Sequence, residues 1–278
     1  MPQNDDTRKE LAALRKEVKR LRAALDRQSP GLDALLARRG FTIYKKEPAD
    51  DLLVPSRAYR ARYYRMLHKY SFRLLLRDVI RRHGVFTPED VTRYSTAGVT
   101  KKYLEDLLSV RLLKKKAGSY ALATGRVKSF GETLEWYVAE AFRREFGSEA
   151  VWGAKFKRPR VGGDYDVISK LDGALFYVEA KSSPPKQIYD SEIAAFLDRV
   201  GDLLPAIAVF LMDTELRMKD KIVPMFEAEL ARRSPYPAGV VRMERELFTI
   251  ENRIFIINAK EDLIGNLRKV WYWYYRHQ

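Results

Sequence analysis

The feature that most constrains the fold is an uninterrupted apolar run at residues 206–212, AIAVFLM, in the second half of the chain. A strand without polar positions is typical of a sheet that is covered by helices on both faces. Amphipathic patterns around this run predict helices at about 130–146, 186–201, 215–232 and from Lys260, and strands within 151–156, 166–169, 174–181 and 240–258. We therefore expect an α/β domain with a mixed central sheet flanked by helices.

The excess of basic over acidic side chains is confined to the first half of the chain. Residues 1–128 contain 30 Lys or Arg and 14 Asp or Glu, whereas residues 129–278 contain 22 and 23. A net charge of +16 attracts polyanions, so nucleic acid is the expected partner of the first half. No apolar run has the roughly 20 residues of a membrane helix, and the first residues do not form a secretory signal. We expect a cytoplasmic, intracellular protein of a prokaryote, with no membrane partner.

The residue inventory restricts the available chemistry. The chain has no cysteine and three histidines, His68, His83 and His277. Disulfides, thiolate zinc sites and cysteine nucleophiles are therefore excluded, and little is left for a histidine-based centre. A catalytic site in this chain has to use carboxylates, lysine, serine, threonine or tyrosine.

Residues 8–28 carry a coiled-coil pattern. Apolar side chains recur at alternating steps of three and four, at Leu11, Leu14, Val18, Leu21 and Leu25, before the Ser29-Pro30-Gly31 stop. Two heptads are marginal alone and need a partner helix. That partner can be a second copy, which gives a homodimer through residues 8–28, or another part of the same chain.

Residues 59–124 predict three helices followed by a hairpin. The helices are expected at about 59–83, at 87–94 and from Thr100, and the strands at 112–116 and 120–123. This order resembles a winged helix-turn-helix, which implies a third helix in the major groove and a wing against phosphates. The implied contacts are Thr100, Lys101, Lys102, Lys114, Lys115 and Lys116. Winged helices that bind other proteins are the alternative.

Two phrases in the second half bring carboxylates and an ammonium group together, GGDYDV at 162–167 and YVEAK at 177–181. Because strand side chains alternate between faces, Glu179 and Lys181 project on the same side, and a turn near 171–173 folds Asp166 back beside them. Two carboxylates suit Mg²⁺ or Mn²⁺. A neighbouring lysine can orient or deprotonate the water that attacks a phosphodiester.

Over about residues 128–215 these phrases resemble the PD-(D/E)XK, or restriction-endonuclease-like, nuclease superfamily. The resemblance implies that Asp166 and Glu179 bind the metal and that Lys181 is the catalytic lysine. It also implies an accessory acid and metal ligand on the preceding helix, where Glu135 fits the pattern. Tyr165 stands where the family usually has proline.

Several other residues are candidates with an equally good structural explanation. Glu132 competes with Glu135, and Asp164 competes with Asp166. The others are a basic loop with Lys155, Lys157, Arg158 and Arg160, a helix start at Lys186 and Gln187, a strand end at Asp213, and the aromatic residues 271–275. The loop can hold a nucleic-acid backbone, and the aromatic residues can stack on bases or pack a helix.

We therefore predict a coiled-coil helix at 1–30, a mostly helical winged-helix nucleic-acid-binding domain at 31–127 and a nuclease domain at 128–278. The predicted activity is Mg²⁺- or Mn²⁺-dependent hydrolysis of phosphodiester bonds by an endonuclease acting on double-stranded or branched DNA. The alternatives are a catalytically inactive nuclease-fold DNA-binding protein and a winged-helix transcription regulator.

Overall fold

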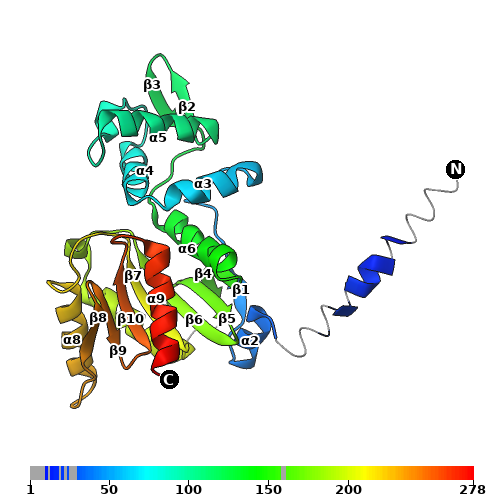
Figure 1. Ribbon diagram of the computed structural model, residues 1–278, viewed down its shortest axis with the longest axis vertical. Helices are drawn as coiled ribbons and strands as arrows, with labels where there is room; N and C mark the ends of the chain where they lie inside the picture. The colour runs from blue at the N-terminus through cyan, green and yellow to red at the C-terminus, as the bar shows by residue number, and fades with distance from the viewer. Residues whose placement is uncertain (1–9, 12, 19, 22–23, 25–29, 158–160) are drawn as a thin grey trace.

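An eight-stranded mixed sheet forms the centre of the molecule (Figure 1). The computed structural model describes residues 10–11, 13–18, 20–21, 24, 30–157 and 161–278. In spatial order the strands are β1 (Ile43–Lys45), β4 (Glu149–Phe156), β5 (Tyr165–Leu171), β6 (Ala174–Lys181), β7 (Ile207–Met212), β10 (Ile254–Asn258), β9 (Leu247–Ile250) and β8 (Val240–Glu244). Strands β6, β7 and β10 are parallel, and the other neighbours are antiparallel.

Strand β7 is buried on both faces, as its apolar run predicts. All six of its residues are buried, and they alternate between two hydrophobic clusters, with Val209 in one and Phe210 in the other. A parallel strand flanked by two parallel neighbours has no solvent-facing side, so a polar residue there would lose its hydration.

Helices cover both faces of the sheet. Helices α6 (Gly131–Glu145) and α9 (Leu263–Arg276) contribute to the cluster on one face. Helices α7 (Asp190–Leu203), α8 (Ile222–Arg233) and α2 (Leu32–Arg38) contribute to the cluster on the other face. The prediction of a mixed α/β sheet flanked by helices is confirmed. In α9, Trp271 lies 5.0 Å from the ring of Phe176, so this aromatic side chain packs a helix against the sheet.

The helical region, residues 57–122, lies above one end of the sheet in Figure 1. It contains η1 (Arg57–Tyr59), α3 (Arg60–Leu67), α4 (Tyr70–Arg82), η2 (Glu89–Val91), α5 (Ala97–Ser109) and the hairpin of β2 (Leu113–Lys116) and β3 (Ser119–Leu122). A single bridge joins Phe86 to Tyr120 of the hairpin. The winged-helix interpretation of this order stays a prediction.

Three details of the helical region differ from the sequence expectations. The helix expected at 59–83 is two helices, α3 and α4, which are interrupted at His68 and Lys69. The helix expected at 87–94 is only the short turn η2. Helix α5 begins before Thr100, because the Thr96 side chain accepts the hydrogen bond from the Val99 amide and caps it there.

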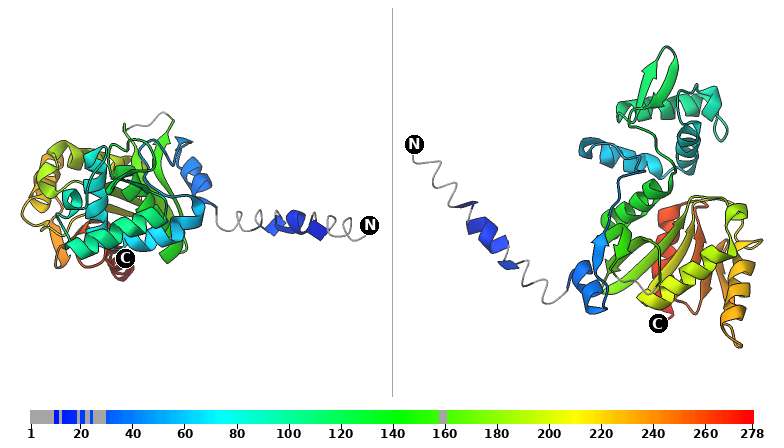
Figure 2. Two further views of the ribbon diagram at one scale, coloured as in Figure 1. Left: turned by 90° about the horizontal axis from the view of Figure 1, so that it is seen from above. Right: turned by 180° about the vertical axis from the view of Figure 1, so that it is seen from behind.

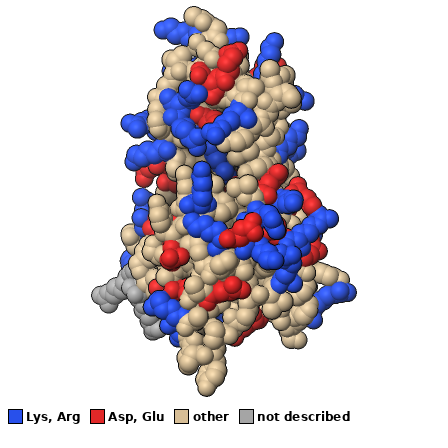
Figure 3. Space-filling model, turned by 90° about the vertical axis from the view of Figure 1, so that its left-hand side faces the viewer, with Lys and Arg blue, Asp and Glu red and all other residues tan. Residues whose placement is uncertain are grey.

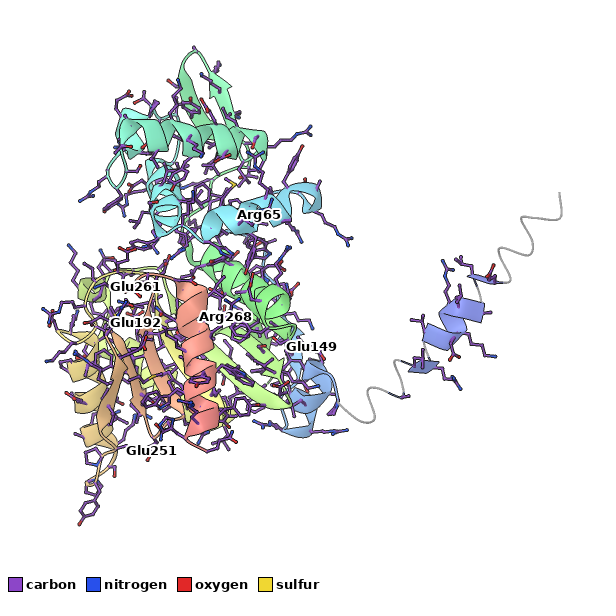
Figure 4. The ribbon with its side chains drawn as sticks, viewed as in Figure 1. Arg65, Glu149, Glu192, Glu251, Glu261 and Arg268 are labelled. Carbon is purple, nitrogen blue, oxygen red and sulfur yellow. The ribbon has the colours of Figure 1, made fainter. Side chains whose placement is uncertain are left out.

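Residues 32–45 precede the helical region in sequence but join the sheet. Strand β1 pairs with the edge strand β4, and the Leu32 amide of α2 donates to Glu149, 2.8 Å away. Figure 2 shows both elements at this edge, and Figure 4 labels Glu149. The domain limits stay a prediction, but these residues, assigned by sequence to the winged-helix part, pack with the sheet.

The predicted coiled-coil segment lies largely outside the described residues. The described part of 8–28, namely 10–11, 13–18, 20–21 and 24, is helical. Leu11, Leu14, Val18 and Leu21 are about half exposed there, and Leu25 is not described. Dimerisation through this helix stays a prediction. Among the described residues, no helix is long and apolar enough to cross a membrane.

Candidate active site

Asp166 and Glu179 occupy matching positions on neighbouring strands. Val167 of β5 pairs with Val178 of β6, so the next antiparallel position places Asp166 opposite Glu179. The Ala180 amide donates a 2.8 Å hydrogen bond to the Asp166 carboxylate. The structure therefore brings the two acids of the sequence motifs together at one end of the sheet.

Glu179 is buried and is held by three side chains. Only 2% of its surface is exposed. The Tyr177 hydroxyl donates to its carboxylate, Arg199 of α7 lies 2.9 Å from one oxygen, and the Lys181 ammonium lies 2.9 Å from the other. Since Tyr177, Glu179 and Lys181 alternate along β6, they share one face of the sheet.

Lys181 lies between two acids. Its ammonium contacts Glu179 and also Glu192 of α7, which is 3.3 Å away. Burial favours the neutral amine, but the carboxylates of Glu179, Asp166 and Glu192 outweigh it and raise the pKa of Lys181 above its usual value. Lys181 is therefore a cation at neutral pH, suited to donating hydrogen bonds and not to accepting a proton.

Glu135 completes the acidic side of the site. Burial and the negative charge of Asp166 raise the pKa of Glu135 to about 9. The pKa of Asp166 is raised to about 8, mainly by burial and by Glu179. On β4, Gly153 adopts a positive φ of 55°, and a β-carbon there would lie 3.6 Å from a Glu135 oxygen and 2.5 Å from Pro48. Gly153 thus leaves room for Pro48 and Glu135 to approach the sheet.

The competing acids have structural partners instead. Glu132 accepts a hydrogen bond from the Asp51 amide at 2.9 Å, which ties α6 to the preceding chain. Asp164 forms a 3.0 Å ion pair with Lys155 across the turn. These contacts favour Glu135 over Glu132 and Asp166 over Asp164 as members of the site.

The predicted three-acid metal set is not assembled in this structure. Across the described residues, no three His, Asp or Glu side chains are close enough to hold a metal ion together. Glu179 does not join such a group because its two oxygens already contact Tyr177, Lys181 and Arg199. Asp166 and Glu179 still fit Mg²⁺, which usually takes one or two carboxylates and completes its shell with water and substrate phosphates.

Sequence reasoning missed Tyr177, Arg199 and Glu192. Tyr177 could have been found by alternation, since it lies two residues before Glu179 on the same strand. Glu192 and Arg199 are seven residues apart, which places them on one face of α7 two turns apart. Which strand residues that face meets depends on tertiary packing, and no local pattern carries this information. Figure 4 places Glu192 near the end of the sheet that faces the helical region.

The predicted nucleic-acid contacts divide into exposed and buried residues. Lys101, Lys102, Lys114, Lys115 and Lys116 are exposed on α5 and β2, and Lys157 is exposed beyond β4. Lys155 is partly covered by its pairing with Asp164, and Arg158 and Arg160 lie outside the described residues. Thr100 is fully buried, and its hydroxyl lies 2.8 Å from that of Ser95. Its inclusion in the binding surface was wrong, because an inward position of α5 faces the core.

Asp213 neither lines the site nor caps a helix. It follows β7 and is fully buried, and Arg73 of α4 lies 2.8 Å from one of its oxygens. Arg77 donates to the other oxygen. Burial favours the neutral acid, but the two guanidinium groups hold the pKa of Asp213 below its usual range. This ion-paired group joins the helical region to the sheet.

No protein-family model matches the sequence, and no curated protein matches it. Among solved structures, the chain is similar to Can2 from Sulfobacillus thermosulfidooxidans in complex with cyclic tetra-adenylate, with 14% identity and a TM-score of 0.49. This match covers 86% of the present chain and 60% of Can2. Protein VC1899 from Vibrio cholerae is similar with 15% identity and a TM-score of 0.43, over 68% of this chain and 53% of that one. The chain thus spans little more than half the length of either structure.

Proposed function

We propose that this protein is a metal-dependent nuclease that hydrolyses phosphodiester bonds in DNA. The observation that carries the proposal is the convergence of Asp166, Glu179 and Lys181 at one end of the sheet, with Glu135 close enough to share their field. Burial and the neighbouring carboxylates raise the pKa values of Asp166 and Glu135, and a divalent cation would favour the ionised forms of both acids.

Mg²⁺ or Mn²⁺ held by Asp166 and Glu179 would polarise the scissile phosphate and lower the pKa of a bound water. The chain's own residues have separate tasks. Lys181, cationic between Glu179 and Glu192, is placed to donate hydrogen bonds to the phosphate or to the attacking water. Tyr177 and Arg199 fix the orientation of the Glu179 carboxylate. Glu135 is the accessory acid.

The helical region supports binding of a polyanion. Its wing-like hairpin presents three consecutive exposed lysines, Lys114, Lys115 and Lys116, and α5 presents Lys101 and Lys102 near its start. We propose that these lysines hold the phosphate backbone of duplex DNA in the manner of a winged helix. Such contacts position a protein without reading sequence.

A binding protein with a degenerate site is the second candidate. Its support is the engagement of Glu179 by Lys181 and Arg199, which already neutralise the carboxylate that a metal would need. In this case the cluster stabilises the fold, and DNA is bound without being cut.

Cleavage assays with matched variants separate the two functions. Purified protein is incubated with duplex, branched and single-stranded DNA in Mg²⁺, in Mn²⁺ or in chelator, beside Asp166→Ala and Lys181→Ala. A nuclease cuts only with metal, and both variants lose at least about a hundredfold in rate. Equal cutting by the wild type and both variants, or retained DNA binding with no cutting by the wild type in any metal, refutes the catalytic assignment.

A further inference from the structure

A cleft of about 560 Å³ lies between the helical region and the sheet, next to the candidate active site. Its walls come from α4 and the following chain, from residues 128–130 before α6, and from the loops after β6 and β7. The volume is within the range of roughly 300–1,000 Å³ that is usual for pockets that enclose a ligand.

The cleft begins where strand β6 ends. Ser182 and Ser183, which line it, follow Lys181 directly, and successive α-carbons are about 3.8 Å apart. The Asp213 amide donates to the Lys181 carbonyl at 2.8 Å, so the ends of β6 and β7 are fixed beside each other at this point. A ligand in the cleft therefore lies next to the end of β6 that carries Lys181.

The cleft offers cations, hydroxyl groups and an aromatic ring beside two acids, Asp78 and Glu215. Arg81 is exposed and has only a 3.5 Å contact to the buried Asp78, and the exposed Lys128 side chain has no ion pair within the described part of the chain. Tyr94 is 45% exposed, and the Arg93 guanidinium lies 5.3 Å from the centre of its ring, so a base that stacks on Tyr94 also lies beside a cation. In Figure 3, which shows the left-hand side of the view in Figure 1, lysine and arginine side chains are frequent over the upper and middle parts, with acidic side chains among them.

These groups match the chemistry of a nucleic-acid strand. Ammonium and guanidinium groups with serine hydroxyls bind phosphates, and an exposed aromatic ring stacks on a base of any sequence. A duplex is bound across its outer surface by elements that enter a groove, whereas this half-open cleft is lined by four separate segments of the chain.

We propose that the cleft binds a single-stranded segment of the nucleic-acid substrate and leads it to the active site. Lys128 and Arg81 contact its phosphates, and Tyr94 stacks on one base. The role as a substrate path rests on the proposed nuclease function. Binding of the strand itself does not, because it requires neither metal nor cleavage.

The test measures binding without cutting. Full-length protein in chelator is titrated against a short fluorescein-labelled oligothymidylate, and fluorescence anisotropy is recorded over a range of salt concentrations. The cleft variants are Lys128→Glu, Arg81→Glu and Tyr94→Ala. Arg65→Glu is the matched control, because Arg65 is exposed on α3 and does not line the cleft (Figure 4). A blunt-ended duplex is the second probe, and thermal melting checks that each variant is folded.

Each charge reversal in the cleft is expected to weaken single-strand binding about 3- to 10-fold and to reduce the salt slope by about 1. Tyr94→Ala is expected to weaken it at least about fivefold, with little change in the salt slope. The Arg65 variant and all duplex affinities should stay within about twofold of the wild type, because neither depends on the cleft.

Two results overturn the inference. One is unchanged oligothymidylate binding in all three folded cleft variants, and the other is an equal loss with the Arg65 control or with the duplex probe. A wild type that binds the oligonucleotide through the cleft but cuts nothing in Mg²⁺ or Mn²⁺ refutes the nuclease proposal and supports the cleft as a binding site.

Discussion

At the ends of the neighbouring parallel strands β6 and β7, a buried carboxylate meets two cationic side chains, but the two groups differ in what surrounds them. Asp213 after β7 pairs with Arg73 and Arg77, and Arg73 is only 1% exposed. Glu179 in β6 pairs with Lys181 and Arg199, whose side chains are 20% and 13% exposed.

The number of neighbouring acids is the main difference between the two strand ends. Around Asp213 two guanidinium groups face a single carboxylate, and the acid is ionised with a lowered pKa. Around Glu179 two further carboxylates, Asp166 and Glu135, have raised pKa values. A buried carboxylate that is ionised between arginines joins two parts of a fold, whereas several acids with raised pKa values at the edge of a cleft are typical of a functional site.

The largest expected change in the free energy of unfolding is at the end of β7, where Asp213 lies. Asp213→Asn should lower the free energy of unfolding by about 3–5 kcal/mol, because Arg73 stays buried with no counter-charge. Urea denaturation followed by tryptophan fluorescence measures this. As a control, Asp198→Asn removes a partner of Arg233 at the surface and should cost less than about 1 kcal/mol. Equal losses in the two variants would contradict the structural role of Asp213.

Glu179→Gln should reduce activity strongly and stability only slightly, in contrast to Asp213→Asn. We expect a loss of about 10²- to 10³-fold in cleavage rate, since the substitution removes a carboxylate from the metal site. The free energy of unfolding should change by less than about 2 kcal/mol, because the amide oxygen still accepts hydrogen bonds and repulsion with Asp166 is relieved. Folded Asp213→Asn should keep its cleavage rate within about tenfold. Comparable activities for the two variants would remove the distinction.

The pH dependence of stability tests the raised pKa values of Glu135 and Asp166. Glu135 and Asp166 have ordinary pKa values of 4.5 and 3.8 and folded values of about 9 and 8, so the folded protein binds more protons between these limits. Stability should therefore fall as the pH rises from about 5 to 9. Urea midpoints at three pH values in chelator measure the slope, and Glu135→Gln should flatten it.

A divalent metal ion should offset this loss of stability at high pH. Mg²⁺ or Mn²⁺ binds the ionised acids of the folded state, so the melting temperature should rise with metal concentration, most clearly above pH 7. Asp166→Ala should abolish this rise. A metal-independent melting temperature in the wild type would count against a metal site at the end of β6.

The smallest expected effects are those of lysine substitutions at Arg73 and Arg199. Two nitrogens of Arg73 contact the same oxygen of Asp213, and a third donates to the carbonyls of Leu67 and His68. Arg73→Lys should therefore lower the free energy of unfolding by about 2 kcal/mol. Arg199→Lys should cost less than about 1 kcal/mol, since its site is more exposed and one ammonium can still reach Glu179. Parallel urea titrations compare the two losses, and equal values would show that both arginines serve the fold alike.

The parts of this fold that could be predicted from sequence are those with a local signal. The apolar run of β7 and the amphipathic pattern of α6 depend on neighbouring residues alone, and both elements lie close to their predicted limits. The strand alternation that places Glu179 beside Lys181 is equally local.

The parts that could not be predicted depend on contacts between distant residues. Arg73 and Asp213 are 140 positions apart, and nothing near either residue indicates the other. Strand β1 has three residues, two of them exposed, so it carries no readable alternation. Thr100 is expected from the sequence to begin a helix, whereas α5 begins one turn earlier after the cap at Thr96, and packing against the core buries Thr100.

The edge pairing of β1 with β4 also has a consequence for the order of folding. Ile43 pairs with Phe156, so about 110 residues, including the whole helical region, separate the two strands in the chain. At a synthesis rate of roughly 5–20 residues per second, β1 leaves the ribosome about 6–20 s before its partner. A contact of this sequence separation closes late, because the entropy of the intervening loop opposes it. The helical region can therefore complete its local contacts before β1 docks on β4.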